Sequence, residues 1–216
     1  MGLITGLRRA KTNDRQIVVY VDGEKLAQIM DTDVAQLGLT RGLEVTEQLG
    51  EEVVQRGRLV EGRTLALRLL ARRACSRTEL KRYLKTKGLD YPTLETVLDQ
   101  LEKLGLVSDA EYARTAAENL VQSGRAGPRG VYSKLRQKGV AADVAATATD
   151  EAMAGQDEEA MARTLAEKRM RALSGLDVYT KRRRLYAFLA RRGFSSETIS
   201  HVIAKLVSAD NEAGSD

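Results

Sequence analysis

The sequence predicts a mainly α-helical protein, a tandem array of three three-helix repeats preceded by a small N-terminal β-hairpin and helix module. Three observations lead to this prediction. After about residue 60, apolar residues recur at spacings of three and four, which is typical of amphipathic helices. Three segments of that region align on a glycine without a gap. Before residue 60, an Asp-Gly pair separates two β-prone runs.

The N-terminal module, residues 1–60, is predicted from the run QIVVYVDGEKLAQIM at 16–30. Asp22 and Gly23 both tolerate the positive φ that a type I′ hairpin turn needs, so they are expected to join two strands. Residues 3–8 are a candidate third strand. Because a hairpin alone is marginal in water, a helix at 32–38 or around 46–56 should pack on it. We interpret this module as structural or docking, since nothing in it looks catalytic.

The three aligned segments are predicted to be helices that end in a glycine C-cap. They are ELKRYLKTKGL, GVYSKLRQKGV and RLYAFLARRGF, ending around Gly88, Gly139 and Gly193. In each, the residues eight and four before the glycine are apolar, the residue before it is basic and the residue after it is apolar. A left-handed glycine, cations in the last turn and an apolar residue that folds back are features of a helix C-terminus.

A helix is expected on each side of every glycine-ended helix. The preceding helices are predicted at about 61–74, 109–123 and 157–174. After the glycine, repeats one and three place apolar residues at offsets of 6, 9, 10 and 13, which form one helical face. Repeat two has only alanine and threonine there, so its last helix must pack closely or be loosely held. The expected divisions are residues 1–60, 61–107, 108–155 and 156–208, with a disordered tail at 209–216. Repeats of this size should stack as an elongated array.

Composition excludes several kinds of chemistry. The 216 residues include one Cys and one His, which cannot supply the usual zinc ligand sets, and there is no phosphate-binding loop motif. His201 lies in a short amphipathic helix, where an exposed helical histidine is the favoured interpretation. We therefore expect no catalytic residue, metal or cofactor. No signal peptide or membrane span is evident, and Cys75 has no disulfide partner, so we expect a cytoplasmic protein.

Taken in order, the motifs resemble those of the RecX family, regulators of the bacterial recombinase RecA. Repeat one has the pattern R-x-x-S-x-x-E-L-x-x-x-L-x-x-K-G, repeat two begins with D-x-x-Y-A, and G-P-x(6)-L-x-x-K-G-V follows. These patterns are carried by Arg73, Ser76, Glu79, Leu80, Leu84, Lys87, Gly88, Asp109, Tyr112, Ala113, Gly127, Pro128, Leu135, Lys138, Gly139 and Val140. The resemblance covers about 61–207. Ser108 departs from the family, which often has two acids before the Tyr-Ala pair, and repeat two has Tyr132 and Lys134 where a glutamate commonly precedes the leucine.

The resemblance implies a non-enzymatic regulator that lies in the groove of the RecA filament on DNA and inhibits its ATP hydrolysis and strand exchange. It also implies a role in homologous recombination, DNA repair and the SOS response. Weak, sequence-independent binding of single- and double-stranded DNA is expected, with no membrane contact and a monomeric state.

The charge pattern is compatible with an anionic partner. The chain has a net charge of +5, of which residues 1–60 carry −1 and the helical part +6. Like charges one turn apart, such as Lys81 and Lys85 or Lys134 and Lys138, oppose helix stability and invite an anion. The candidate DNA- or filament-binding residues are Arg72, Arg73, Lys81, Arg82, Lys85, Lys87, Arg129, Lys134, Arg136, Lys138, Arg183, Arg184, Arg191 and Arg192.

Two other functions remain open from the sequence, a transcriptional regulator and a nuclease. A tandem helix-turn-helix transcriptional regulator would also contain three-helix units, but the capped helices offer Lys, Arg and Leu instead of base-reading Asn and Gln. A nuclease would need clustered acids that the sequence lacks. Tyr83, Tyr112 and Tyr186 are predicted to lie in the core, and Tyr132 on the surface, so phosphate contacts should dominate over base stacking.

Overall fold

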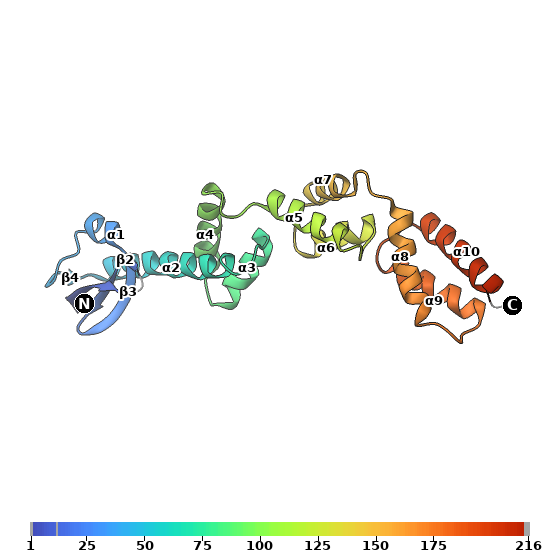
Figure 1. Ribbon diagram of the computed structural model, residues 1–216. Helices are drawn as coiled ribbons and strands as arrows, with labels where there is room; N and C mark the ends of the chain where they lie inside the picture. The colour runs from blue at the N-terminus through green and yellow to red at the C-terminus, as the bar shows by residue number, and fades with distance from the viewer. Residues whose placement is uncertain (1, 12, 214–216) are drawn as a thin grey trace. The chain divides into compact units, whose positions relative to one another are not determined.

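The computed structural model describes residues 2–11 and 13–213 and divides into two compact units, Met1–Val107 and Ser108–Asp216 (Figure 1). The first unit contains β1 (Gly2–Ala10), β2 (Asn13–Val21), β3 (Glu24–Met30), α1 (Asp31–Gln36), β4 (Glu44–Val45), α2 (Glu47–Leu70), α3 (Arg77–Thr86) and α4 (Tyr91–Lys103). The second contains α5 (Asp109–Gln122), α6 (Pro128–Gln137), α7 (Ala142–Met153), α8 (Glu158–Arg171), α9 (Val178–Ala190) and α10 (Ser196–Ala213). The predicted class, helical repeats after a small β module, is confirmed.

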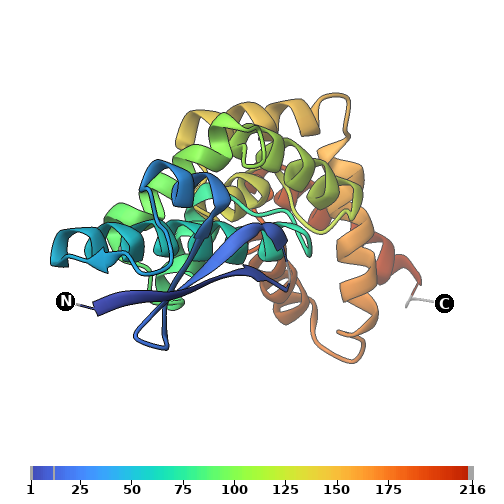
Figure 2. The same ribbon diagram turned by 90° about the vertical axis from the view of Figure 1, so that its left-hand side faces the viewer.

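The N-terminal strands form an antiparallel sheet of order β3-β2-β1-β4, and Figure 2 looks onto these twisted strands. Asp22 and Gly23 have φ values of 49° and 88°, so both central residues adopt the positive φ that the predicted hairpin requires. The third strand is also present as β1, and it is longer than the expected 3–8. The two-residue β4 was not predicted, because so short a strand has no periodic signal.

Helix α2 corrects one prediction. Two separate helices were expected around 46–56 and 61–74, with a module boundary at residue 60, but α2 runs without a break from Glu47 to Leu70. Its internal glycines allow close packing. A Cβ at Gly57 would lie 2.8 Å from the Cβ of Ala27 in β3, and one at Gly62 would lie 2.5 Å from Leu89. The same helix therefore packs on the sheet with its first half and forms the first helix of repeat one with its second half.

The three glycine-ended helices form as predicted, and they end alike. Gly88, Gly139 and Gly193 have φ values of 87°, 84° and 80°. In each repeat the amide after the glycine donates to the carbonyl five residues earlier, as in the 3.4 Å bond from Phe194 to Leu189. This is the Schellman hydrogen bond, which satisfies a carbonyl that the helix leaves open. The apolar positions on which the alignment rests are buried: Leu80, Leu84, Val131, Leu135, Leu185 and Leu189.

Repeat two packs closely, which is one of the two outcomes left open for its alanine-rich last helix. Ala145, Ala148 and Thr149 of α7 are buried in one core with Ala113 and Ala117 of α5. The Thr149 hydroxyl donates a 2.7 Å bond to the carbonyl of Ala145, so its burial leaves no hydroxyl unsatisfied. Small side chains let these two helices approach closely.

The C-terminal helix extends further than expected. The sequence predicts a disordered tail at 209–216, whereas α10 continues to Ala213, and residues 214–216 lie outside the described part of the chain. No glycine or proline occurs between Ser196 and Ala213, so the sequence contains no residue that would end the helix earlier. Among the described residues, no helix is both long and apolar enough to cross a membrane.

Candidate interface for an anionic partner

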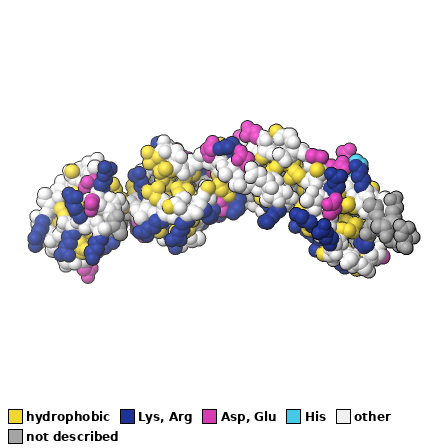
Figure 3. Space-filling view, in the orientation of Figure 1, with side chains coloured by type: hydrophobic (Ala, Val, Ile, Leu, Met, Phe, Trp, Pro, Cys, Tyr) yellow, Lys and Arg dark blue, Asp and Glu magenta, His cyan; other side chains and the backbone are white. Residues whose placement is uncertain are grey.

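Most of the cations that the sequence singled out lie on the surface. In the space-filling view, Lys and Arg side chains gather over α3 in the first unit and near α9 in the second (Figure 3). Lys138 is also exposed. Within the described residues, nine exposed candidates have no ion pair to a carboxylate: Arg72, Arg82, Lys85, Lys87, Arg129, Lys134, Arg183, Arg184 and Arg191.

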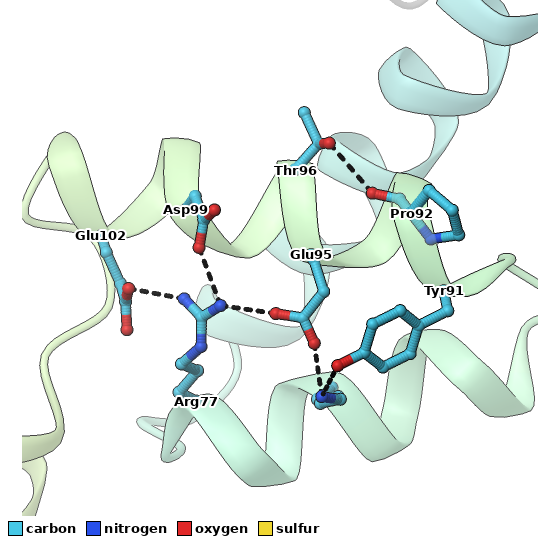
Figure 4. A network of polar contacts seen from close by, with 8 residues as sticks. Arg77, Tyr91, Pro92, Glu95, Thr96, Asp99 and Glu102 are labelled. Atoms are coloured by element: carbon cyan, nitrogen blue, oxygen red, sulfur yellow. Dashed lines mark hydrogen bonds and ion pairs between the residues drawn. The ribbon is translucent and has the colours of Figure 1, made fainter.

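Lys81 is different, because its anionic partner lies inside the same repeat. Its ammonium group pairs with Glu95 of α4 and lies 4.5 Å from the centre of the Tyr91 ring. The hydrogen bond to Glu95 is the main cause that raises the pKa of Lys81. One turn earlier, Arg77 reaches three carboxylates along α4, at 2.7 Å from Glu95, 2.8 Å from Asp99 and 2.5 Å from Glu102 (Figure 4). These contacts join α3 to α4.

Two further candidates also have contacts within their own repeat. Arg73 pairs with Glu79 at 3.3 Å. Arg136 donates a 2.6 Å bond to the carbonyl of Val140, just past the glycine that ends α6. These side chains stabilise helix ends, which is a common role of basic residues in a last turn. Of the candidates on α3, Arg82 and Lys85 are therefore left without a carboxylate partner among the described residues.

Replacement of Arg77 by Ala is expected to lower the free energy of unfolding of the first unit by about 1–2 kcal/mol. The Arg77 side chain is only 25% exposed, and its loss leaves the partly buried carboxylate of Glu95 with one cation fewer. Urea denaturation followed by circular dichroism measures this change. Arg82→Ala, at an exposed position of the same helix, is the matched control and should change stability by no more than about 0.5 kcal/mol.

The difference between the wild type and Arg77→Ala should also depend on pH. The hydrogen bond from Lys81, and after it the one from Arg77, lowers the pKa of Glu95. A lowered folded-state pKa means that the stabilisation is fully present above the ordinary glutamate value of about 4.3. It is lost as the pH falls through the lowered value. A constant difference between the two proteins down to about pH 3 would contradict a role for this ion pair.

Repeats two and three are joined by a close contact between glycines. The amides of Gly127 and Arg129, at the start of α6, donate to the carbonyls of Arg192 and Gly193, just past the end of α9, at 3.0 and 3.1 Å. A Cβ at Gly130 would lie 2.0 Å from the carbonyl oxygen of Arg192. The N-terminus of α6 and the C-terminus of α9 thus satisfy each other's open backbone groups. Their opposite helix dipoles also attract.

Four arginines lie at or beside this contact, a group we call the seam cluster: Arg129, Arg169, Arg191 and Arg192. Arg129 and Arg191 line one depression of about 290 Å³. The guanidinium groups of Arg192 and Arg169 lie 3.7 and 5.6 Å from the centre of the Phe188 ring, which can hold both by cation–π attraction. Burial, and after it the positive charges of Arg191 and Arg169, lowers the pKa of Arg192. Positive charge is therefore concentrated at the seam.

Sequence reasoning missed Arg169, since it lies on α8 and not on a glycine-ended helix. It also missed a stripe on α9 in which two tyrosines flank two arginines: Tyr179, Arg182, Arg183 and Tyr186. Their spacing of i, i+3, i+4 and i+7 puts them on one helical face. Tyr179 is 75% exposed and Tyr186 is 42% exposed, so both rings are accessible. That spacing was readable in the sequence and could have identified the stripe.

The tyrosine predictions are therefore corrected in two places. Tyr186 was expected in the core but is exposed, because it follows the buried Leu185 by one residue and so points about 100° away from the apolar face. Tyr132 was expected on the surface but is half-buried against the core of repeat two. Tyr83 and Tyr112 pack on their cores as predicted.

The remaining polar features have structural roles. Ser108, the departure from the family pattern, is the N-cap of α5 and accepts a 3.3 Å bond from the amide of Glu111. Asp109 and Glu111 supply the acidic first turn. His201 is exposed on α10 and lies 3.0 Å from Glu159, as a surface histidine. Within the described residues, no three His, Cys, Asp or Glu side chains are grouped so that they could hold a metal ion.

Comparison with known proteins identifies the repeats. Models of the first, second and third three-helix domains of RecX match residues 63–101, 108–148 and 157–203. "Regulatory protein RecX" of Amycolatopsis mediterranei is 39% identical over 137 residues, covering 63% of this chain and 78% of the relative. The protein of the same name from Chlorobaculum tepidum is 36% identical over 151 residues, covering 70% and 91%.

Solved structures show that the fold is shared as well. A crystal structure of regulatory protein RecX superposes with a TM-score of 0.72 at 20% identity, covering 94% of this chain and 98% of that one. RecX from Lactobacillus salivarius superposes with a TM-score of 0.56 at 22% identity, covering 69% and 96%. The three domain matches, their order and the sequence relatives agree: this chain belongs to the RecX family of regulatory proteins.

Proposed function

We propose that this protein binds the RecA filament on DNA and inhibits ATP hydrolysis and strand exchange by the recombinase. Membership of the RecX family supports RecA as the partner, and the exposed cations without carboxylate partners support an anionic surface on that partner. The observation that carries the proposal furthest is the seam cluster. The positive charges of Arg191 and Arg169 repel that of Arg192, and Arg129 lines the same depression as Arg191. A phosphate or carboxylate of the partner would relieve that repulsion.

Weak, sequence-independent DNA binding follows from the same chemistry. Guanidinium and ammonium groups on α3, α6 and α9 contact phosphates without reading bases. On α9, Tyr179 and Tyr186 flank Arg182 and Arg183, and exposed rings can stack on unpaired bases while arginines contact the intervening phosphates. This differs from the sequence-based expectation that phosphate contacts alone dominate. It favours single-stranded DNA over duplex DNA at this helix.

The protein acts by binding and not by catalysis, as a cytoplasmic monomer. Its named relatives are regulatory proteins, and within the described residues no His, Cys, Asp and Glu side chains are grouped as a metal site. The alternative, a helix-turn-helix transcriptional regulator, would require side chains that read base edges. The exposed faces of α3 and α6 offer mainly Lys and Arg.

The test is DNA-dependent ATP hydrolysis by RecA from the same organism, with this protein added below the stoichiometry of RecA. We expect suppression at a salt concentration where the protein alone does not bind DNA, since filament contacts and phosphate contacts differ in salt dependence. Footprinting on random and genomic DNA is the companion measurement. A footprint with a large preference for one sequence, and no effect on ATP hydrolysis, would support the transcriptional regulator instead.

A further inference from the structure

A second basic surface lies in the first unit, where α2 leaves the sheet. Two adjoining depressions of about 790 and 470 Å³ occur there, and they share Gln16, Val60, Thr64 and Arg68 in their walls. We call the two together the α2 groove. One side is formed by residues of β2 and β3 and the other by α2. Gln16 is buried and bonded at 2.6 Å to Gln28, which fixes the strand side of the groove.

The groove carries positive charge that no carboxylate within the described residues neutralises. Arg15, Lys25, Arg63 and Arg68 all line it, all are exposed, and none has an ion pair there. Two acids line the groove, Asp33 and Glu61. Within the described residues, Glu61 is the one of them that has no cationic partner.

The two other arginines in the walls are already neutralised. Arg56 pairs with Asp33 at 2.6 Å and with Glu52 at 2.9 Å, and Arg58 pairs with Asp90 at 3.2 Å. These pairs use Asp33, Glu52 and Asp90, so Glu61 is the acid left in the walls beside the four free cations.

Between the cations the walls include apolar side chains as well as polar ones. Leu59, Val60 and Leu67 of α2 line the groove. Leu67 is 39% exposed, although α2 packs on the sheet before this residue and on α4 beside it. The close approach of Gly57 to Ala27 keeps α2 against β3, so the floor is a fixed part of the fold. An occupant would bury these leucines while its charges met the arginines at the rim.

We infer that the α2 groove binds an acidic peptide segment of a partner protein, one in which carboxylates alternate with apolar side chains. The carboxylates match the four free cations, and the apolar side chains match the leucine floor. A nucleic acid strand fits less well, because no aromatic side chain lines the groove to stack on a base. Tyr179 and Tyr186, which supply such rings, lie in the other unit.

This inference is independent of the proposed RecA function, since it concerns different residues and a different ligand. The first of the three RecX domain models begins its match at residue 63. Much of the groove wall precedes that residue and so lies outside the matched part of the chain. The N-terminal module thus provides a docking site in addition to covering α2.

The experiment measures fluorescence anisotropy of a fluorescein-labelled peptide of repeated Glu-Glu-Leu with the full-length protein. A Gln-Gln-Leu peptide and labelled oligothymidylate are the comparison probes. We expect the triple variant Arg15→Gln, Arg63→Gln, Arg68→Gln to bind the acidic peptide about tenfold more weakly. It should bind oligothymidylate as the wild type does. Leu67→Ala should weaken peptide binding several-fold without changing any charge.

The matched control is Arg182→Gln, Arg183→Gln, Arg184→Gln on α9, which removes the same number of charges. It should lose oligothymidylate binding and keep peptide binding. Three outcomes would each overturn the inference. The two triple variants could lose affinity for the acidic peptide equally, or the wild type could bind the Gln-Gln-Leu peptide as tightly as the acidic one. The groove variant could also lose its affinity for oligothymidylate. Suppression of RecA ATP hydrolysis is measured with the same proteins. If the wild type suppresses hydrolysis but does not bind the acidic peptide, the groove inference fails while the proposed function stands. Circular dichroism establishes that each variant is folded.

Discussion

Replacement of Gly130 by Ala is expected to destabilise the second unit by about 2–3 kcal/mol, although Ala is normally the better helix former. The added Cβ would lie 2.0 Å from the carbonyl oxygen of Arg192. That oxygen belongs to the backbone, so it cannot rotate away as a side chain would. Relief of the overlap requires α6 and the end of α9 to separate. Separation breaks the hydrogen bonds from Gly127 and Arg129 as well.

Gly193→Ala should have a larger effect, and repeat one offers its control. Gly193 combines a φ of 80° with an added Cβ only 1.9 Å from the amide of Gly130. Gly88 occupies the same position in repeat one with a φ of 87°, but its added Cβ would meet nothing within 4 Å. Gly88→Ala should therefore lower the free energy of unfolding by only about 1 kcal/mol, because the one penalty is the left-handed conformation that Ala must adopt.

Urea denaturation, together with hydrogen exchange of α6 and α9, measures these effects. In Gly130→Ala and Gly193→Ala, exchange should rise in both helices while α3 and α4 stay protected. A Gly130→Ala protein as stable as the wild type would show that the contact between repeats two and three is not maintained in solution.

The double variant Arg129→Glu, Arg191→Gln should bind duplex DNA about 30-fold more weakly at about 0.15 M salt. Loss of two phosphate contacts also reduces the slope of log affinity against log salt by about 1.8. Both side chains are exposed. An acid at position 129 lies in the first turn of α6, where a negative charge favours the helix. The variant should therefore fold normally while losing affinity.

Anisotropy of labelled duplex DNA across a salt series tests this expectation. The control is Arg63→Glu, Arg68→Gln in the α2 groove, which changes the charge by the same amount and should leave the salt slope unchanged. If both variants weakened DNA binding equally, net charge and not the seam cluster would account for the affinity. The double variant should also lose suppression of RecA ATP hydrolysis if the seam contacts the filament.

The elements that were predictable from the sequence are those whose signals are local. Glycine C-caps depend on residues within one turn, so the patterns around Gly88, Gly139 and Gly193 are sufficient to locate three helix ends. The Asp22-Gly23 turn is another such signal. Continuity of α2 was not predictable, because Gly57 and Gly62 are present for contacts with Ala27 and Leu89, which are distant in sequence.

In the candidate interface, too, the sequence predicted the features that depend on local pattern and missed those that depend on distant residues. The sequence correctly placed most of its cations on the surface, because a basic residue off the apolar stripe of an amphipathic helix faces solvent. It could not separate Lys81 from Lys85. The two have the same type and lie one turn apart, and only the packing of α4 brings Glu95 to one of them. Arg169 was missed for the related reason that the ring which holds it, Phe188, belongs to another helix.

The fold class, the number of repeats, the ends of the three glycine-capped helices and the family were all readable from the sequence, since each of these is specified by periodicity and short motifs. Three features could be learned only from the folded chain: which charges remain free, how repeats two and three are joined through Gly130 and Gly193, and that the N-terminal module forms a basic groove with α2. Neutralisation of a charge, and the space available to a Cβ, depend on atoms a few ångströms away that come from other parts of the chain.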